Sequence, residues 1–323
     1  MGPSGVGTGG GQFVFGPETL DQGRGSVGFR LTYTRPDQRS DDKLESLAGE
    51  HVHAHNTDYN LNASVGVAFG ITHQFTLSAE LPFVRRDNLR EGEHSDVADE
   101  SFNHVVRLGN VAGLGDMNVL AKYRLTRGTE GGLALVAGIK VPTGSTHKRS
   151  TEGERLETEH QPGTGSWDPI LGASAGTRVG PLMLTASALY QLSGKGAQRT
   201  ELGDRLQAGV ALSHHFGPSE HHREAGQNHH HGDELDDHHE DHARSAWDAF
   251  VELSGEWEGR QKVDGDVEPD SGGKAVWLTP GVRFTSAGGL SLGGSVGVPV
   301  WQRIRASHPN NDYRVTLSVG APF

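Results

Sequence analysis

The chain has 323 residues, a formal net charge of −12, 47 glycines and a hydrophobic content of only 33%. The acidic balance argues against a nucleic-acid partner, because phosphate binding needs a basic surface. The absence of cysteine excludes disulfides, thiolate metal sites and cysteine nucleophiles. No run of about 18 apolar residues is present, so no transmembrane helix is expected.

The first 24 residues form a polar, glycine-rich lead. Its start, MGPSGVGTGGGQ, lacks the apolar core of a signal peptide. Either the protein is not exported, or a signal has been removed from it. We expect residues 1–24 to lie in the periplasm as an extension too short to form a plug domain.

Apolar and polar side chains alternate through the rest of the chain with the two-residue period of a β-strand. In 59–71, for example, Val65, Val67 and Phe69 share one face. Most such segments have the length that a tilted strand needs to cross a bilayer. The twelve predicted strands are 26–34, 59–71, 74–84, 117–125, 132–142, 167–176, 182–192, 204–215, 246–257, 275–284, 290–301 and 312–323.

Charged side chains occur on only one face of these segments. A soluble β-sandwich also alternates, but its apolar face is a closed core and its charges meet bulk water. A Lys or Arg at the lipid midplane costs about 2–4 kcal/mol, so a charge-free face indicates a wall in contact with lipid. The opposite face then lines a wet lumen. The predicted lumen-lining residues are Arg30, Glu80, Lys122, Arg124, Lys140, Asp168, Arg205, Asp248, Glu252, Glu256, Arg283 and Arg314.

Aromatic residues and loop lengths favour the same architecture. All five tyrosines lie on the apolar face near segment ends, as in the aromatic girdles of membrane proteins. Long and short connections alternate, with the short turns expected on the periplasmic side. The sequence therefore predicts an all-β fold: a transmembrane antiparallel up-and-down β-barrel of about 12 strands over 25–323, in the outer membrane of a Gram-negative bacterium.

One connection on the short side is long and rich in histidine and acidic residues. Between 214 and 242 there are ten histidines with interleaved carboxylates, a composition suited to Zn, Cu, Ni or Co. The alternative is a solvated acidic loop that binds metal only incidentally. The predicted periplasmic insertion is 217–245, and its candidate ligands are His221, His222, His229, His230, His231, His238, His239 and His242.

A smaller cluster, EHVHAH, places His51, His53 and His55 at alternate positions. In a strand they would share one face, which suits a metal site, although an ordinary polar loop also fits. No G-x-S-x-G nucleophile motif is present, and no catalytic residue or required cofactor is predicted.

Three stretches resemble a known family: GLGDMNVLAKYRL at 113–125, GIKVPTG at 138–144 and GTGSWDPILGASAG at 163–176. They are similar to the outer-membrane barrels named for the meta-pathway of phenol degradation. The resemblance implies a β-barrel with a proposed role in moving small, often aromatic, molecules across the outer membrane, and it brings no catalytic residues.

Two hypotheses follow for the function. The first is an outer-membrane channel for small solutes, with a His-rich loop that binds transition-metal ions. The second is a barrel with a closed lumen that has a structural role or binds a metal or a partner. The expected partners are the lipid bilayer and a small solute or metal ion, and the sequence does not distinguish a monomer from a trimer.

Overall fold

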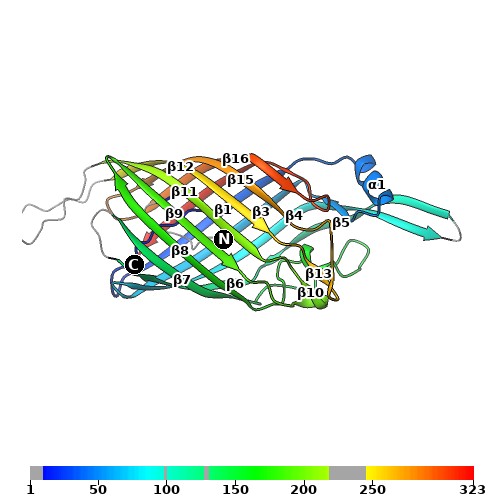
Figure 1. Cartoon of the computed structure of the whole chain (residues 1–323), viewed down its shortest axis with the longest axis horizontal. Coiled ribbons are helices and arrows are strands. Elements are labelled where there is room, and N and C mark those ends of the chain that lie inside the picture. Colours follow the sequence, from blue (N-terminus) through cyan, green and yellow to red (C-terminus); the bar gives the residue numbers. More distant parts are fainter. Residues whose placement is uncertain (1–9, 98–99, 127–130, 218–244) are drawn as a thin grey trace, which may run out of the picture.

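The wall of the protein is a closed antiparallel β-barrel (Figure 1). The computed structural model describes residues 10–97, 100–126, 131–217 and 245–323. Among them, no helix is long and apolar enough to cross a membrane. The strands of the wall are β1 (Gly25–Pro36), β3 (Tyr59–Thr72), β4 (Phe75–Val97), β6 (Met117–Arg124), β7 (Gly131–Val141), β8 (Asp168–Val179), β9 (Leu182–Gln191), β11 (Arg205–Phe216), β12 (Ala246–Glu258), β15 (Gly273–Thr285), β16 (Ser291–Ile304) and β17 (Asn311–Pro322).

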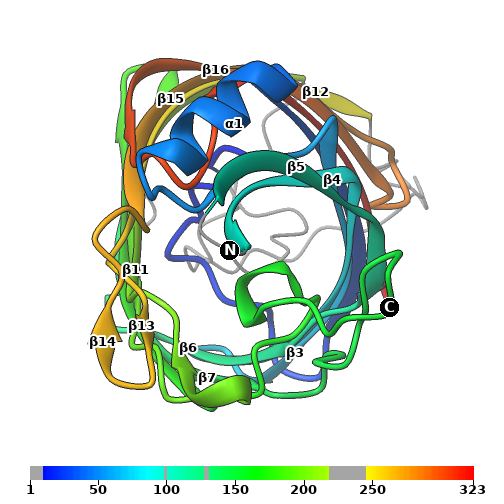
Figure 2. The same cartoon turned by 90° about the vertical axis from the view of Figure 1, so that its right-hand side faces the viewer.

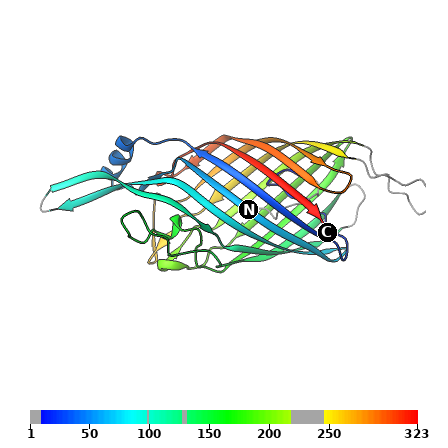
Figure 3. The ribbon, with the colours of Figure 1, turned by 180° about the vertical axis from the view of Figure 1, so that it is seen from behind.

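The barrel closes where the first strand of the wall meets the last. β1 pairs with β17 from Ser26 opposite Pro322 to Thr34 opposite Arg314, and the two strands lie side by side in Figure 3. Closure matters because lipid cannot hydrogen-bond to an open sheet edge. The predicted twelve-stranded barrel is confirmed, since the apolar alternation that lipid requires is also what marks these strands in the sequence.

The region 85–116, expected to be a loop, is instead a long hairpin. β4 continues to Val97 and pairs with β5 (Glu100–Leu114), and the two strands extend beyond the barrel at the end where the long loops lie (Figure 1). Outside the bilayer no lipid-facing side is needed, and apolar residues of the extension such as Leu89, Val105 and Val111 pack against neighbouring loops instead. Backbone pairing maintains the strands there without the alternation that would have revealed them.

The long loops carry further small elements at the same end. α1 (Asp41–Gly49) begins after Ser40, whose side chain accepts a hydrogen bond from Lys43 N, and it packs against the β4–β5 hairpin. The other elements are β2 (Ala54–Asn56), η1 (Thr158–His160), η2 (Ala197–Arg199), β10 (Thr200–Glu201), β13 (Lys262–Val263) and β14 (Asp266–Val267).

The outer face of the wall is an apolar belt that is bounded at each end by a girdle of aromatic side chains. Leu171 and Leu317 are more than half exposed, which lipid tails can cover and water would not favour. At the long-loop end Tyr33 stacks on Tyr59, and at the opposite end Trp247 lies 5.0 Å from Phe284. This belt places the barrel in the outer membrane of a Gram-negative bacterium, where barrels generally have their short turns on the periplasmic side.

Candidate functional site in the barrel lumen

Residues 10–20 of the lead, here called the inner segment, lie inside the barrel (Figure 2). Gly16 O accepts hydrogen bonds from Lys122 Nζ at 3.3 Å and from Ser174 Oγ at 3.1 Å. Leu20 N donates to Thr76 Oγ1 at 2.9 Å. This position differs from the periplasmic extension expected from the sequence, because polar groups of the inner wall bind the peptide groups of the segment.

Glu252 on β12 is the main acceptor for the inner segment. Its Oε2 accepts hydrogen bonds from Phe13 N at 2.9 Å and from Val14 N at 3.2 Å. The side chain is fully buried, so these charge-assisted bonds offset the cost of removing a carboxylate from water. Gly11 lies so close that a Cβ atom there would be 1.9 Å from Oε2, which explains why the segment turns on a glycine.

Arg314 on β17 provides a second contact, by stacking. Its guanidinium carbon lies 3.8 Å from the ring centre of Phe13 and 4.3 Å from that of Trp277 on β15. One arm donates to Glu256 at 2.7 Å and the other to Ser254 Oγ at 3.2 Å. The cation is therefore sandwiched between a ring of the inner segment and a ring of the wall.

Phe15 occupies an apolar patch on an otherwise polar inner wall. It forms one buried cluster with Leu120, Val136, Ile170 and Leu189, which come from β6, β7, β8 and β9. Burial of a phenylalanine side chain is worth about 1.5–3 kcal/mol. Sequence reasoning missed this patch because it treated the inner face as uniformly polar. The FVF triplet at 13–15 in the polar lead was the available signal.

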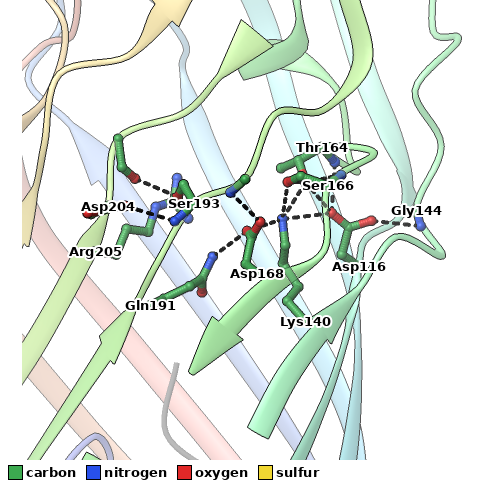
Figure 4. Close-up of polar contacts among 12 residues, drawn as sticks. Asp116, Lys140, Gly144, Thr164, Ser166, Asp168, Gln191, Ser193, Asp204 and Arg205 are labelled. Atoms are coloured by element: carbon green, nitrogen blue, oxygen red, sulfur yellow. Dashed lines mark hydrogen bonds and ion pairs between the residues drawn. The ribbon is translucent and has the colours of Figure 1, made fainter. Parts of the chain in front are cut away.

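A buried ion cluster ties a long loop to the rim of the barrel (Figure 4). Lys140 Nζ lies 3.2 Å from Asp116 Oδ2 and 2.6 Å from Asp168 Oδ2. Asp116 also accepts hydrogen bonds from Gly144 N and Thr164 N, which belong to the loop that follows β7. Each charge thus has an opposite charge beside it, and the cluster stabilises the rim rather than presenting a free charge to a solute.

The structure brings five of the predicted lumen-lining residues to the inner segment. Arg283 donates to Gly11 O, and Arg30 lies 6.0 Å from the ring centre of Phe13. The other three are Lys122, Glu252 and Arg314.

The remaining predicted lining residues lie elsewhere on the wall. Arg205 pairs with Glu258 at 2.9 Å, and Asp248 lies 2.9 Å from His215. Of the twelve, Lys140, Asp168, Glu252, Arg283 and Arg314 are buried, while Arg30, Glu80, Lys122, Arg124, Arg205, Asp248 and Glu256 are partly exposed. The predicted metal ligands His221, His222, His229, His230, His231, His238, His239 and His242 lie outside the described residues.

Comparison with known proteins supports the architecture. No family model matches the chain, and no curated protein matches its sequence. The structure is similar to that of an outer membrane channel from Pseudomonas putida F1, with a TM-score of 0.57 and 16% identity over 95% of this chain and 97% of that chain. A Bordetella autotransporter β domain gives a TM-score of 0.46 at 9% identity over 94% of this chain and 100% of that chain. At 16% identity the likeness to the Pseudomonas channel shows the fold, and the class of protein is a transmembrane β-barrel of the outer membrane.

Proposed function

We propose that the protein is an outer-membrane channel for small solutes whose path is closed by the inner segment. The observation that supports this most is that residues 10–20 lie within the lumen and are bound to its wall by noncovalent contacts. Eight strands give a barrel filled by side chains, and sixteen leave an aqueous channel. A twelve-stranded barrel lies between these sizes, so one short peptide can close its lumen. The similarity to a solved outer membrane channel fits this role.

Opening would require movement of the inner segment and no change in the wall. The segment joins β1 at the periplasmic end, so it can withdraw toward the periplasm while the strands stay paired. Withdrawal would uncover the patch around Leu120 and the ring of Trp277. Both favour a small apolar or aromatic solute, as the resemblance to the phenol meta-pathway barrels also suggests. We propose that the protein belongs to that family, and we propose no catalytic activity for it.

The test is a reversible lock on the inner segment. A Cβ atom at Gly11 lies 3.1 Å from Cβ of Glu252, close to the separation of about 3.5–4.5 Å found in disulfides. In the double variant Gly11→Cys with Glu252→Cys, we expect single-channel conductance in planar bilayers after reduction and its loss after oxidation. The matched control is Gly11→Cys alone, which should not respond to reductant. The chain has no other cysteine to interfere.

Two further measurements decide between the hypotheses. Phenol should block the open current of the reduced variant more strongly than inositol, a polar ring of similar size. If neither the wild type nor the reduced double variant conducts, with or without Zn²⁺, Cu²⁺ or Ni²⁺, the channel hypothesis is wrong. The closed-lumen barrel that binds a metal or a partner would then be the better description.

We also propose that the tract 217–245 binds Zn, Cu, Ni or Co ions, a role supported by its eight histidines and the acidic residues interleaved with them. The test compares calorimetric Zn²⁺ titrations of the wild type and a tract-Asn variant, in which the eight tract histidines named above are asparagine. We expect the variant to bind fewer ions. Equal binding by the two proteins would remove the metal role of the tract.

A further inference from the structure

Two histidines and a glutamate from separate loops meet at the extracellular mouth. His55 lies on β2, Glu91 on the extension of β4, and His160 at the end of η1. One potential ligand atom from each residue lies within 4.8 Å of the other two. The side chains are almost completely buried, with exposed fractions of 3%, 6% and 3% for the three residues.

The cluster contains nitrogen atoms that the protein itself does not satisfy. Nδ1 of His55 and Nε2 of His160 are buried and have no hydrogen-bond partner among the described residues. His55 Nδ1 lies 3.7 Å from Glu91 Oε1, which is too long for a hydrogen bond. Leaving a buried polar atom unpaired costs about 1–3 kcal/mol, so two such atoms beside a carboxylate indicate a missing ligand.

The surrounding residues hold these side chains in place. Glu159 Oε1 lies 2.6 Å from His55 Nε2 and 3.6 Å from His160 Nε2. A carboxylate behind a histidine is the usual outer-shell arrangement of a metal site, since it fixes the tautomer and the direction of the ring. Arg86 donates to the backbone carbonyls of Glu159 and His160, at 3.2 Å and 3.0 Å. Glu159 and Arg86 therefore position the His55 ring and the backbone at His160 while leaving the unpaired Nδ1 of His55 uncontacted by either residue.

We propose that His55, Glu91 and His160 bind one transition-metal ion that clamps three extracellular loops together. Two imidazoles and a carboxylate suit Zn²⁺, Co²⁺ or Ni²⁺ better than Ca²⁺ or Mg²⁺, which prefer oxygen ligands. Zinc ligands at about 2.0–2.2 Å from the ion lie about 3.3–3.6 Å apart, so ligand atoms within 4.8 Å of one another need to approach by at most about 1.5 Å. Three protein ligands leave the fourth tetrahedral position to water.

Of the three alternating histidines in EHVHAH, only His55 belongs to this site. His53 approaches Glu91 at 3.7 Å, but its side chain is 79% exposed. His51 packs edge-on against His94, with ring centres 4.7 Å apart. The site is separate from the His-rich tract, since the strand ends that flank the tract, Phe216 and Ala246, lie at the other end of the barrel. It is also independent of whether the barrel conducts.

The test uses the full-length tract-Asn variant defined above, so that the tract does not mask the mouth. We expect one Zn²⁺ per chain by calorimetry, and Co²⁺ should give the intense visible absorption of tetrahedral coordination. Adding His160→Ala should weaken binding at least tenfold and remove that absorption. Adding His147→Ala, an exposed histidine of the same loop, should change neither quantity.

Further variants separate binding from folding. Glu91→Gln keeps the size of the side chain and should weaken Zn²⁺ binding in a chain that still shows the heat-dependent gel mobility of a folded barrel. Glu159→Gln should weaken binding about tenfold while the tetrahedral Co²⁺ absorption is retained, as expected for a positioning residue. The proposal is overturned if the tract-Asn variant binds no Zn²⁺, or if His160→Ala binds it as tightly as its parent.

Discussion

At the scale of single residues, the closed state of the lumen depends most on Glu252. Glu252→Gln keeps an oxygen acceptor for Phe13 N and Val14 N but removes the negative charge. Because hydrogen bonds to a charged group are about twice as strong as neutral ones, we expect the docked segment to lose about 1–2 kcal/mol. A loss of 1.4 kcal/mol corresponds to about tenfold more of the undocked state.

This prediction is measured by thiol labelling. A Val14→Cys probe in the otherwise cysteine-free chain should react about tenfold faster with a polar maleimide when Glu252→Gln is present. The control is Glu258→Gln on the same strand, because Glu258 pairs with Arg205 and not with the inner segment. Equal labelling rates in the two variants would show that Glu252 does not hold the segment.

Individual site residues were only partly predictable from the sequence. Alternation along a strand identifies Glu252 and Arg314 as inward, because lipid excludes charge from the other face. It cannot identify their partners, since Phe13 lies 239 positions before Glu252 and the contact involves one turn of an irregular peptide. Glu256 on β12 pairs with Arg314 on β17, and alternation alone does not specify this contact either.

At the scale of elements, the sequence predicts the strands that cross the bilayer but not the elements that lie outside it. Strands of the wall appear in the sequence because each must present apolar side chains to lipid. The β4–β5 extension and α1 lie beyond that constraint, so their residues are selected by local contacts instead. His160 illustrates the consequence, since no sequence spacing connects it to His55, yet the folded loops place their rings 4.3 Å apart.

The attachment of helix α1 to the hairpin should depend mainly on its apolar face. Leu44 is fully buried with Leu47 and Ala54, and a nine-residue helix is not stable in isolation. Leu44→Ala should cost about 2–5 kcal/mol and detach α1 from the β4–β5 hairpin. We expect trypsin to cleave after Lys43 much faster, while the barrel keeps its heat-dependent gel mobility. Ser46→Ala, on the exposed face of the same helix, is the control and should leave cleavage slow.

At the scale of the whole molecule, the low apolar content of 33% has a simple explanation. A soluble protein needs apolar residues to fill a core, whereas this barrel needs them mainly on a belt one side chain deep. Lipid covers that belt, and the inside contains polar groups, ion pairs and the inner segment. A low apolar content alone therefore fits either a disordered chain or a membrane β-barrel. The alternation of apolar and polar residues along the strands is what identifies the barrel.

The position of the belt predicts how the cost of a charge varies with depth. Val210 lies in the middle of β11 and is 45% exposed. Leu206 lies on the same face but is paired with Tyr190 and Trp257, two residues of an aromatic girdle. Val210→Arg should reduce the free energy of unfolding from lipid vesicles by about 2–4 kcal/mol, and Leu206→Arg by about 0–1 kcal/mol, as measured by guanidinium titration. The introduced residue, the strand and the face are the same, so depth in the bilayer is the main difference between the two variants. Equal losses would mean that Val210 does not face the lipid midplane, and the register of the entire wall would then be wrong.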